Sequence, residues 1–315
     1  MHLGRPEIDH AWRLLAPYRG RFLRETPVLK LAGAALGIDC AEVWLKLEQL
    51  QVGGSFKARG MLHRLLANPV PASGAVIASG GNAGIAAAAA ARELGVPCEV
   101  FLPAISSAAK RQRLAALQAR VVVAGAAYAD ALQACLERQA QTGALLLHAY
   151  DQAEVVAGAG TLAREIEQQC GLPDSVLVSV GGGGLIGGVA AWFGPLARVV
   201  ALEPELAPTL HAARAAGTPV DVGVGGIAAD SLGARRIGAI AWELTGQHVG
   251  TSLLLTEGAI RAAQLWLWQE LRLALEPGAA LGLAALQTGA YRPGPGERVC
   301  LILCGANFDP GSLAG

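Results

Sequence analysis

The sequence predicts an α/β protein built from two open, twisted, mainly parallel sheets with flanking helices. Short Val/Ile/Leu runs recur without the polar alternation of half-exposed strands, which indicates strands covered on both faces. Segments rich in Ala, Leu, Gln, Glu and Arg separate these runs and favour helices. Strands that alternate with helices are typical of parallel sheets with helical crossovers.

Each element follows from its local pattern. Apolar runs predict strands at 75–78, 98–102, 120–123, 144–147, 176–180, 199–202 and 299–303. Helix-forming composition predicts helices at 82–94, 107–117, 127–141 and 153–170. Gly95, Gly125, Gly143 and Gly171 stand where helix C-caps belong.

The order of these elements predicts two domains. The strand–helix units between residues 75 and 148 suffice for one compact sheet, and the later strands suffice for a second. No Pro/Ser-rich linker separates the two groups, so we expect the chain to leave one sheet and return to it. This predicts a discontinuous large domain over 1–60 and 150–315 and a small domain over 61–149.

Composition restricts the partners. The 315 residues are 53% hydrophobic, which allows large cores, and 25 basic residues balance 25 acidic ones. Because the net charge is zero, the chain has no long-range electrostatic attraction for nucleic acid or for an acidic membrane surface. We therefore expect a small-molecule partner. Residues 176–197 are uncharged and long enough to span a bilayer, but glycines and Pro195 divide them into a predicted strand, loop and short helix.

The cysteines and the N-terminal segment predict the compartment. Six cysteines without CxxC spacing favour a reducing environment over a disulfide framework or a thiolate metal site. Residues 1–15 mix charged and apolar side chains and lack the apolar core of a secretory signal. We therefore expect a cytoplasmic protein.

The first candidate site is the glycine run 181–188, directly after a predicted strand. Glycines let the backbone approach a phosphate, and the following helix offers free amides and a positive dipole end. Gly182, Gly184 and Gly187 also satisfy G-x-G-x-x-G, with Glu203 about 20 residues further on, as in a dinucleotide site. Alone, the run leaves three interpretations open: a dinucleotide loop, a simple phosphate loop or a structural turn.

The second candidate site is Lys57 in the segment 53–60 (GGSFKARG). A lysine on a helix is ordinarily solvated. Here two glycines and Ser55 indicate a helix start, so Lys57 faces the positive dipole end, which costs stability. The same field lowers the pKa of Lys57 toward the deprotonated amine that carbonyl chemistry requires.

The third and fourth candidates also follow strands. The segment 79–84 (SGGNAG) is a second anion cradle, and two cradles suit a phosphorylated cofactor and the carboxylate of an amino-acid substrate. The alternative is that Ser79 and Asn82 only cap the next helix. Cys304 follows the last predicted strand, where parallel sheets bind ligands, although a free cysteine there is ordinarily a small core residue.

Together these motifs resemble the serine/threonine dehydratases of pyridoxal-phosphate fold type II, the tryptophan-synthase-β-like group. The matching motifs span nearly the whole chain in order: Thr26-Pro27 with Leu29, Lys46-Leu47-Glu48-Gln49, Gly54 to Gly60, Ser79 to Gly84, Gly181 to Gly184, Glu203-Pro204, Glu276-Pro277, and Cys304 to Asn307. A dinucleotide-binding dehydrogenase has no reason to carry the segments around Lys57 and Ser79, so the resemblance disfavours that interpretation.

The resemblance implies a role for each matching residue. Lys57 corresponds to the lysine that holds pyridoxal 5′-phosphate as a Schiff base, and Phe56 to the ring-stacking residue. The other cofactor-binding residues are Asn82 at the phenolic oxygen, Cys304 at the pyridine nitrogen, and the phosphate loop of Gly181, Gly182, Gly183, Gly184 and Leu185. The substrate carboxylate is expected on the loop of Ser79, Gly80, Gly81, Asn82 and Ala83. The large domain is expected to hold the cofactor and the small domain to carry the substrate loop.

The implied activity is dehydration and deamination of L-serine and/or L-threonine to pyruvate or 2-oxobutanoate plus ammonia, with Lys57 as the catalytic base. A thiol at position 304 cannot hold a pyridinium as an aspartate does, so the ring is expected to stay neutral and to favour prompt β-elimination. Racemases of the family carry a serine where this chain has Gly80, which disfavours racemisation. The alternatives are a threo-3-hydroxyaspartate dehydratase, a threonine synthase, a β-replacement enzyme, an NAD-dependent dehydrogenase and a catalytically silent amino-acid-binding protein.

A cation site is also implied by the resemblance. The racemases use a Glu, a carbonyl and an Asp, and the matching positions here are Glu203, Ala207 and Thr209. A hydroxyl in place of a carboxylate suits a monovalent cation such as K+ better than magnesium. The alternative is that Glu203 is a strand-end surface residue. The family further suggests a homodimer, and because the chain ends soon after Cys304 we expect no C-terminal regulatory domain.

Overall fold

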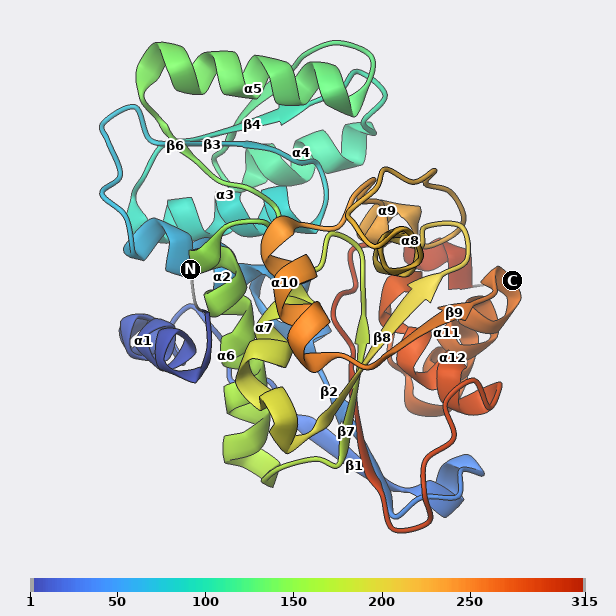
Figure 1. The fold of residues 1–315 in the computed structure, drawn as a ribbon. Helices are drawn as coiled ribbons and strands as arrows, with labels where there is room; N and C mark the ends of the chain where they lie inside the picture. Colours follow the sequence, from blue (N-terminus) through green and yellow to red (C-terminus); the bar gives the residue numbers. More distant parts are fainter. Residues whose placement is uncertain (1–2, 314–315) are drawn as a thin grey trace.

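Two mainly parallel sheets organise the computed structural model, which describes residues 3–313 (Figure 1). A six-stranded sheet has the order β1-β2-β10-β7-β8-β9, and a four-stranded sheet has the order β5-β4-β3-β6. Every pair of neighbouring strands is parallel except β1 and β2. The predicted fold class is therefore confirmed.

The structure has the following bounds. The strands are β1 (Val28–Ala32), β2 (Glu42–Lys46), β3 (Ala75–Ala78), β4 (Cys98–Leu102), β5 (Arg120–Val123), β6 (Leu145–Leu146), β7 (Ser175–Ser179), β8 (Arg198–Pro204), β9 (Thr251–Leu255) and β10 (Arg298–Ile302). The α-helices are α1 (Arg5–Leu15), α2 (Lys57–Leu66), α3 (Asn82–Leu94), α4 (Ala108–Ala116), α5 (Tyr128–Thr142), α6 (Ala153–Cys170), α7 (Gly184–Phe193), α8 (Thr209–Ala216), α9 (Ala229–Leu232), α10 (Ala239–His248), α11 (Glu257–Leu271) and α12 (Leu281–Gln287).

The four-stranded sheet is covered on both faces, as its apolar runs predict. Along β3, Ala75 and Ile77 pack with the buried alanines of α3, while Val76 and Ala78 pack with Ala131 of α5 on the opposite face. Figure 1 shows α5 on one side of this sheet and α3 and α4 on the other. Two-sided burial explains why these strands lack polar alternation.

The six-stranded sheet is likewise sandwiched between helices. Contacts place α12 against β7, β8, β9 and β10, and place α7 against β7 and β8. Figure 1 shows α11 and α12 on one side of the sheet and α6, α7 and α10 on the other. The largest core cluster fills both layers and includes Trp44, Phe193 and Leu301. This arrangement leaves the carboxyl ends of the parallel strands facing the four-stranded sheet.

Helix α6 lies in backbone contact with both α2 and α7. A Cβ atom at Gly60 of α2 would lie 2.6 Å from the carbonyl oxygen of Val155, and one at Gly188 of α7 would lie 2.5 Å from the amide nitrogen of Gly160. Only glycine permits such close approach. The position of α2, which begins at Lys57, and that of α7 are therefore both fixed by α6.

Most of the predicted elements are confirmed. The helices predicted at 82–94 and 153–170 have those bounds, and Gly95, Gly143 and Gly171 are helix C-caps. The C-cap prediction for Gly125 is wrong, because this residue follows β5 and α4 ends earlier, with Leu117 as its C-cap. The two sheets fall on opposite sides of the proposed domain boundaries, while the boundaries themselves stay a prediction.

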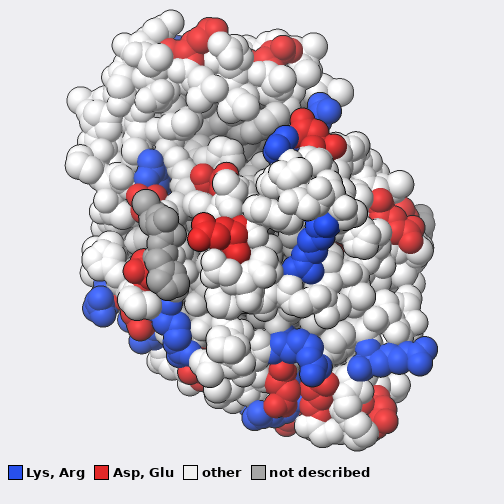
Figure 2. All heavy atoms as spheres, viewed as in Figure 1, with Lys and Arg blue, Asp and Glu red and all other residues white. Residues whose placement is uncertain are grey.

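The surface agrees with the balanced composition. Figure 2 shows basic and acidic side chains in small groups of mixed sign on the face in view. None of the helices within residues 3–313 is long and apolar enough to cross a bilayer, and the uncharged segment 176–197 forms β7, a loop and α7. All six cysteines are free thiols.

Candidate active site

A cavity of about 340 Å³ lies where the two sheets face each other. The four-stranded sheet contributes residues 78–83 after β3 and Tyr128 at the start of α5. The other side contributes Lys57, Gly182 and parts of the segment 229–236. The cavity thus collects three of the sequence-predicted sites at the carboxyl ends of parallel strands, where open α/β sheets bind ligands.

Lys57 begins α2 and points its amine at the cavity wall. Its Nζ donates a hydrogen bond of 2.6 Å to the carbonyl oxygen of Ala149. Burial lowers the pKa of Lys57 to about 8, against the opposing effects of Cys304 and Glu276. The predicted direction of the shift holds, although desolvation is its largest cause, whereas the sequence argument relied on the helix dipole. A substantial fraction of this amine is therefore deprotonated just above neutral pH.

Phe56 lies beside the lysine but belongs to the core. Its ring centre is 5.1 Å from Lys57 Nζ, and its side chain packs in the large hydrophobic cluster. Among the described residues it is not part of the cavity lining. Its ring-stacking role therefore stays a prediction.

The tetraglycine loop presents unsatisfied amides. Within residues 3–313 no hydrogen-bond partner is found for the amides of Gly182, Gly183, Gly184 and Leu185, although most of the loop is buried. The loop is closely packed against its surroundings: a Cβ added at Gly182 would lie only 2.3 Å from the ring of Tyr150. Buried donors without partners at a helix N-terminus form an anion site. This loop therefore fits the phosphate of a cofactor.

The loop after β3 forms the second cradle. Across the described chain no partner is found for the amides of Asn82 and Ala83, which begin α3 beside the cavity. A Cβ at Gly80 would lie 2.9 Å from the end of the Leu102 side chain, so position 80 accepts a side chain only if Leu102 moves. The capping alternative for Asn82 is wrong: α3 has no side-chain N-cap, and the Asn82 amide is bonded elsewhere.

The Asn82 side chain is held by Glu276 and Asn307, whose importance the sequence argument missed. Asn82 Nδ2 donates to both Glu276 carboxyl oxygens, at 2.8 and 3.1 Å, and Asn82 Oδ1 accepts from Asn307 Nδ2. Burial raises the pKa of Glu276 to about 7. The only sequence signal was that both residues stood in family motifs without an assigned role.

Cys304 is buried behind the cavity. Its Sγ lies 3.9 Å from the carbonyl oxygen of Gly278, and burial raises the pKa of the thiol. The side chain therefore stays a neutral thiol at physiological pH. A neutral group at this position is consistent with the role that the resemblance implies.

Glu203 is buried rather than on the surface. Its carboxylate accepts hydrogen bonds from the amides of Leu210 and His211 at 2.7 and 2.8 Å, and from the hydroxyl of Ser252 at 3.3 Å. These bonds fix the start of α8. The Thr209 hydroxyl lies 3.2 Å from the Glu203 carboxylate and donates its proton to the nearer Gly181 carbonyl, at 2.6 Å. The carboxylate is thus engaged within the protein, which leaves it unsuited to bind the ribose of a dinucleotide.

A buried charge cluster anchors α2. Arg59 pairs with Glu48 and Glu165 at 2.7 and 2.9 Å, and Lys46 pairs with Glu165 at 2.6 Å. All four side chains are at most 2% exposed. Two cations balance two anions, so the cluster is neutral and holds the helix that begins at Lys57.

The architecture and the site define an α/β protein with a glycine loop suited to an anion and a lysine of lowered pKa between two sheets. Comparison with known proteins gives its family: residues 21–305 match the model described as "Pyridoxal-phosphate dependent enzyme", and the chain belongs to this family. Its structural neighbours are fold type II enzymes, among them maize serine racemase, with a TM-score of 0.92, 28% identity, and 100% and 96% of the two chains covered.

Two curated relatives illustrate the range of activities. The chain is 34% identical to the phenylserine dehydratase of Ralstonia pickettii, covering 93% of this chain and 91% of that protein. It is 31% identical to the L-threonine ammonia-lyase of Thermotoga maritima, covering 85% and 68% respectively. The family depends on pyridoxal phosphate and acts on small amino acids, while these relatives differ in substrate and reaction.

Proposed function

We propose that the chain dehydrates and deaminates small β-hydroxy amino acids, L-serine and/or L-threonine, to a 2-oxo acid and ammonia. The observation that carries the proposal is the cavity itself: one lysine with a lowered pKa faces an amide-rich loop, and position 80 of that loop is glycine. Relatives named threonine ammonia-lyase and phenylserine dehydratase support a lyase.

The residues present fit pyridoxal phosphate, which would supply an electron sink for the Cα carbanion. The free amides of the tetraglycine loop would hold its phosphate, Lys57 would hold its aldehyde carbon, and Asn82 and Cys304 would face its ring. The amides of Asn82 and Ala83 would bind the substrate carboxylate. Once the substrate amine has displaced it, Lys57 Nζ would take the Cα proton, and the β-hydroxyl would leave with one proton as water, so that the net loss is one water. Hydrolysis of the resulting enamine consumes one water and gives the 2-oxo acid and ammonia.

Absorbance tests the cofactor role of Lys57. The purified protein should carry a visible absorbance band that borohydride removes, and Lys57→Ala should lack it, because Lys57 is the one lysine in the cavity lining among the residues that the structure describes. Mass spectrometry after borohydride reduction should find the modification on the peptide that contains Lys57. A colourless wild-type protein, or a modification on another lysine, contradicts the proposal.

Chiral analysis tests elimination against racemisation. Without a side chain at position 80, the opposite face of Cα has no acid–base group there, so 2-oxo acid release should exceed D-serine formation by at least about 100-fold. Gly80→Ser should raise D-serine formation relative to elimination, while the matched Gly80→Ala adds a Cβ without a hydroxyl and should not. Equal rates of racemisation and elimination in the wild type overturn the assignment.

A substrate panel separates the remaining alternatives. Ammonia release from serine, threonine, phenylserine and threo-3-hydroxyaspartate distinguishes the dehydratases, one of which is the named activity of the Ralstonia relative. Faster turnover of serine with sulfide, or of phosphohomoserine, indicates β-replacement or threonine synthesis instead. A protein that forms the borohydride-sensitive band but releases no 2-oxo acid is an amino-acid-binding protein.

The cation and the homodimer remain proposals that rest on the resemblance. A monovalent cation near Glu203, Ala207 and Thr209 should raise the melting temperature in K+ relative to tetramethylammonium at equal ionic strength. Equal melting temperatures contradict the site. The Glu203 carboxylate would then be held only by the hydrogen bonds that it already accepts from Leu210, His211 and Ser252. Light scattering of the purified chain measures the oligomeric state.

A further inference from the structure

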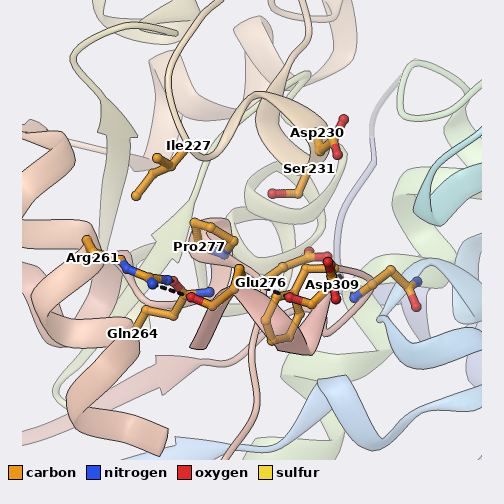
Figure 3. A pocket seen from close by; sticks show the side chains of 11 residues that line it. Ile227, Asp230, Ser231, Arg261, Gln264, Glu276, Pro277 and Asp309 are labelled. Atoms are coloured by element: carbon orange, nitrogen blue, oxygen red, sulfur yellow. Dashed lines mark hydrogen bonds between the residues drawn. The ribbon is translucent and has the colours of Figure 1, made fainter. Parts of the chain in front are cut away.

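A single buried carboxyl connects the active-site cavity with a second cavity. Glu276 is 3% exposed and lines a neighbouring cavity of about 340 Å³ together with Arg261, Asp309 and Asn307 (Figure 3). Its Oε1 atom lies directly against Gly305, where a Cβ would be only 2.2 Å away. Glu276 is not among the lining residues of the active-site cavity, but its hydrogen-bond partner Asn82 is, so the carboxyl reaches that cavity through Asn82.

The hydrogen bonds of this carboxyl fix the Asn82 amide in one orientation. Asn307 Nδ2 donates to Asn82 Oδ1 and to the carbonyl oxygen of Gly53, at 2.7 Å for the second bond, so it cannot act as an acceptor. Asn82 Nδ2 must therefore turn toward Glu276, which also accepts from the Asn307 backbone amide at 3.1 Å. A flipped Asn82 amide would place its NH2 group against the NH2 group of Asn307, and its oxygen against the carboxylate of Glu276.

We propose that Glu276 is a positioning residue of this site, whose ionised carboxylate holds the Asn82 amide in place. The inference rests on the proposed function, in which Asn82 faces the cofactor ring. A fixed Asn82 keeps one N–H directed at its ligand.

The electrostatics around Glu276 support this role. The Glu276 carboxylate raises the pKa of Lys57, and Lys57 in turn lowers the pKa of Glu276, while Asp230 raises it. Cys304 also faces the pair, but burial raises the pKa of its thiol and keeps it neutral. Arg261 lines the second cavity and is bonded to Gln264 and the Ser312 carbonyl.

The proposal predicts a pH limit. Because burial raises the pKa of Glu276 to about 7, protonation removes an acceptor of the Asn82 amide as the pH falls through neutrality. The ionised form is the competent one, so activity should be present above this pKa and lost below it. In the holoenzyme Lys57 would be bound to the cofactor and would not titrate as a free amine. His148, whose pKa burial lowers, is a second group near Lys57 that could produce such a limb.

Competitive acetylation of the cofactor-free protein tests whether Glu276 is ionised at this site. The reactivity of Lys57 toward acetic anhydride, followed against pH by peptide mass spectrometry, measures the pKa of Lys57 without turnover. Glu276→Gln should lower this pKa by at least about half a unit, because the carboxylate charge is lost. Glu276→Asp should restore it, and Arg261→Gln, in the same cavity, should leave it unchanged. Equal values in wild type and Glu276→Gln contradict an ionised Glu276 and overturn the proposal.

The pH profile of the holoenzyme provides the second arm. The acid limb of kcat/KM should disappear in Glu276→Gln, with the plateau reduced by roughly 10-fold, and persist in Glu276→Asp and in His148→Asn. Persistence of the limb in Glu276→Gln contradicts the positioning role. If the wild type releases no 2-oxo acid, the proposed function fails while the acetylation result still decides the role of Glu276.

Discussion

At the scale of single residues, the shape of the glycine loop depends on the absence of Cβ atoms at Gly182 and Gly183. Gly182 contacts the ring of Tyr150, and Gly183 has a φ of +91°, a left-handed conformation that side chains disfavour. The loop amides face no partner within residues 3–313, so their function requires that no Cβ changes the path of the loop. We therefore expect the loop glycines to be required for anion binding by the loop amides. Measurements of protein stability alone would not detect this requirement.

Gly182→Ala should weaken pyridoxal phosphate binding. The added Cβ would lie 2.3 Å from the Tyr150 ring, so the loop or the ring must shift. We expect the dissociation constant, measured by fluorescence titration of the cofactor-free protein, to rise by roughly 10-fold or more. Gly258→Ala is the matched control, since it lies in α11 with open space around its Cα and should bind normally and gain about 0.5–1 kcal/mol. Unchanged affinity in Gly182→Ala contradicts the phosphate-loop assignment.

At the scale of elements, α2 begins at Lys57 and, two residues later, contributes Arg59 to the neutral cluster of buried charges. Removing one member of such a cluster leaves its partners buried and uncompensated, which costs more than the intact cluster contributes. The cluster therefore makes the position of α2 sensitive to single substitutions far from the cavity.

Arg59→Leu should lower the free energy of unfolding by about 3–5 kcal/mol, because Glu48 and Glu165 lose a buried partner. Urea denaturation at neutral pH measures the loss. Arg298→Gln is the control: it breaks a half-exposed pair with Asp174 and should cost about 0–1 kcal/mol. A loss in Arg59→Leu no larger than in the control would show that the cluster does not anchor the helix.

The sequence predicted the doubly covered strands and the long helices but missed β1, β2 and β9 of the large sheet. Strand β1 is mostly exposed or half-exposed, and β2 includes the buried Lys46, so neither forms the apolar run on which the prediction relied. The glycine loops and Lys57 were predictable because turn and helix-start chemistry is local. Glu276 was not, since its partner Asn82 lies 194 residues away and only the fold brings them together.

At the scale of the whole molecule, the balance of charges determines how strongly long-range electrostatics can speed substrate association. Lys plus Arg equals Asp plus Glu, and the charges on the face in Figure 2 are mixed. Without a net field, long-range steering of a zwitterionic amino acid is weak. Substrate capture should then depend on contacts inside the cavity.

The rate should accordingly respond little to salt. We expect kcat/KM for serine to change by less than about 2-fold between roughly 0.05 and 0.5 M tetramethylammonium chloride, because screening removes only long-range interactions. Steady-state kinetics at fixed pH and fixed K+ measures this. A steep decline with salt would indicate a local field at the cavity mouth that the overall composition conceals.

Helix α6 supplies no side chain to the lining of the active-site cavity, yet its glycine face touches the helices that carry Lys57 and the tetraglycine loop. A helix that lines no part of the cavity thus sets how far apart α2 and α7 lie. For protein engineering, we expect a side chain at Gly158 to displace α2, since its Cβ would lie 2.8 Å from the Cα of Gly60, and one at Gly160 to displace α7, since its Cβ would lie 3.0 Å from the Gly188 carbonyl oxygen.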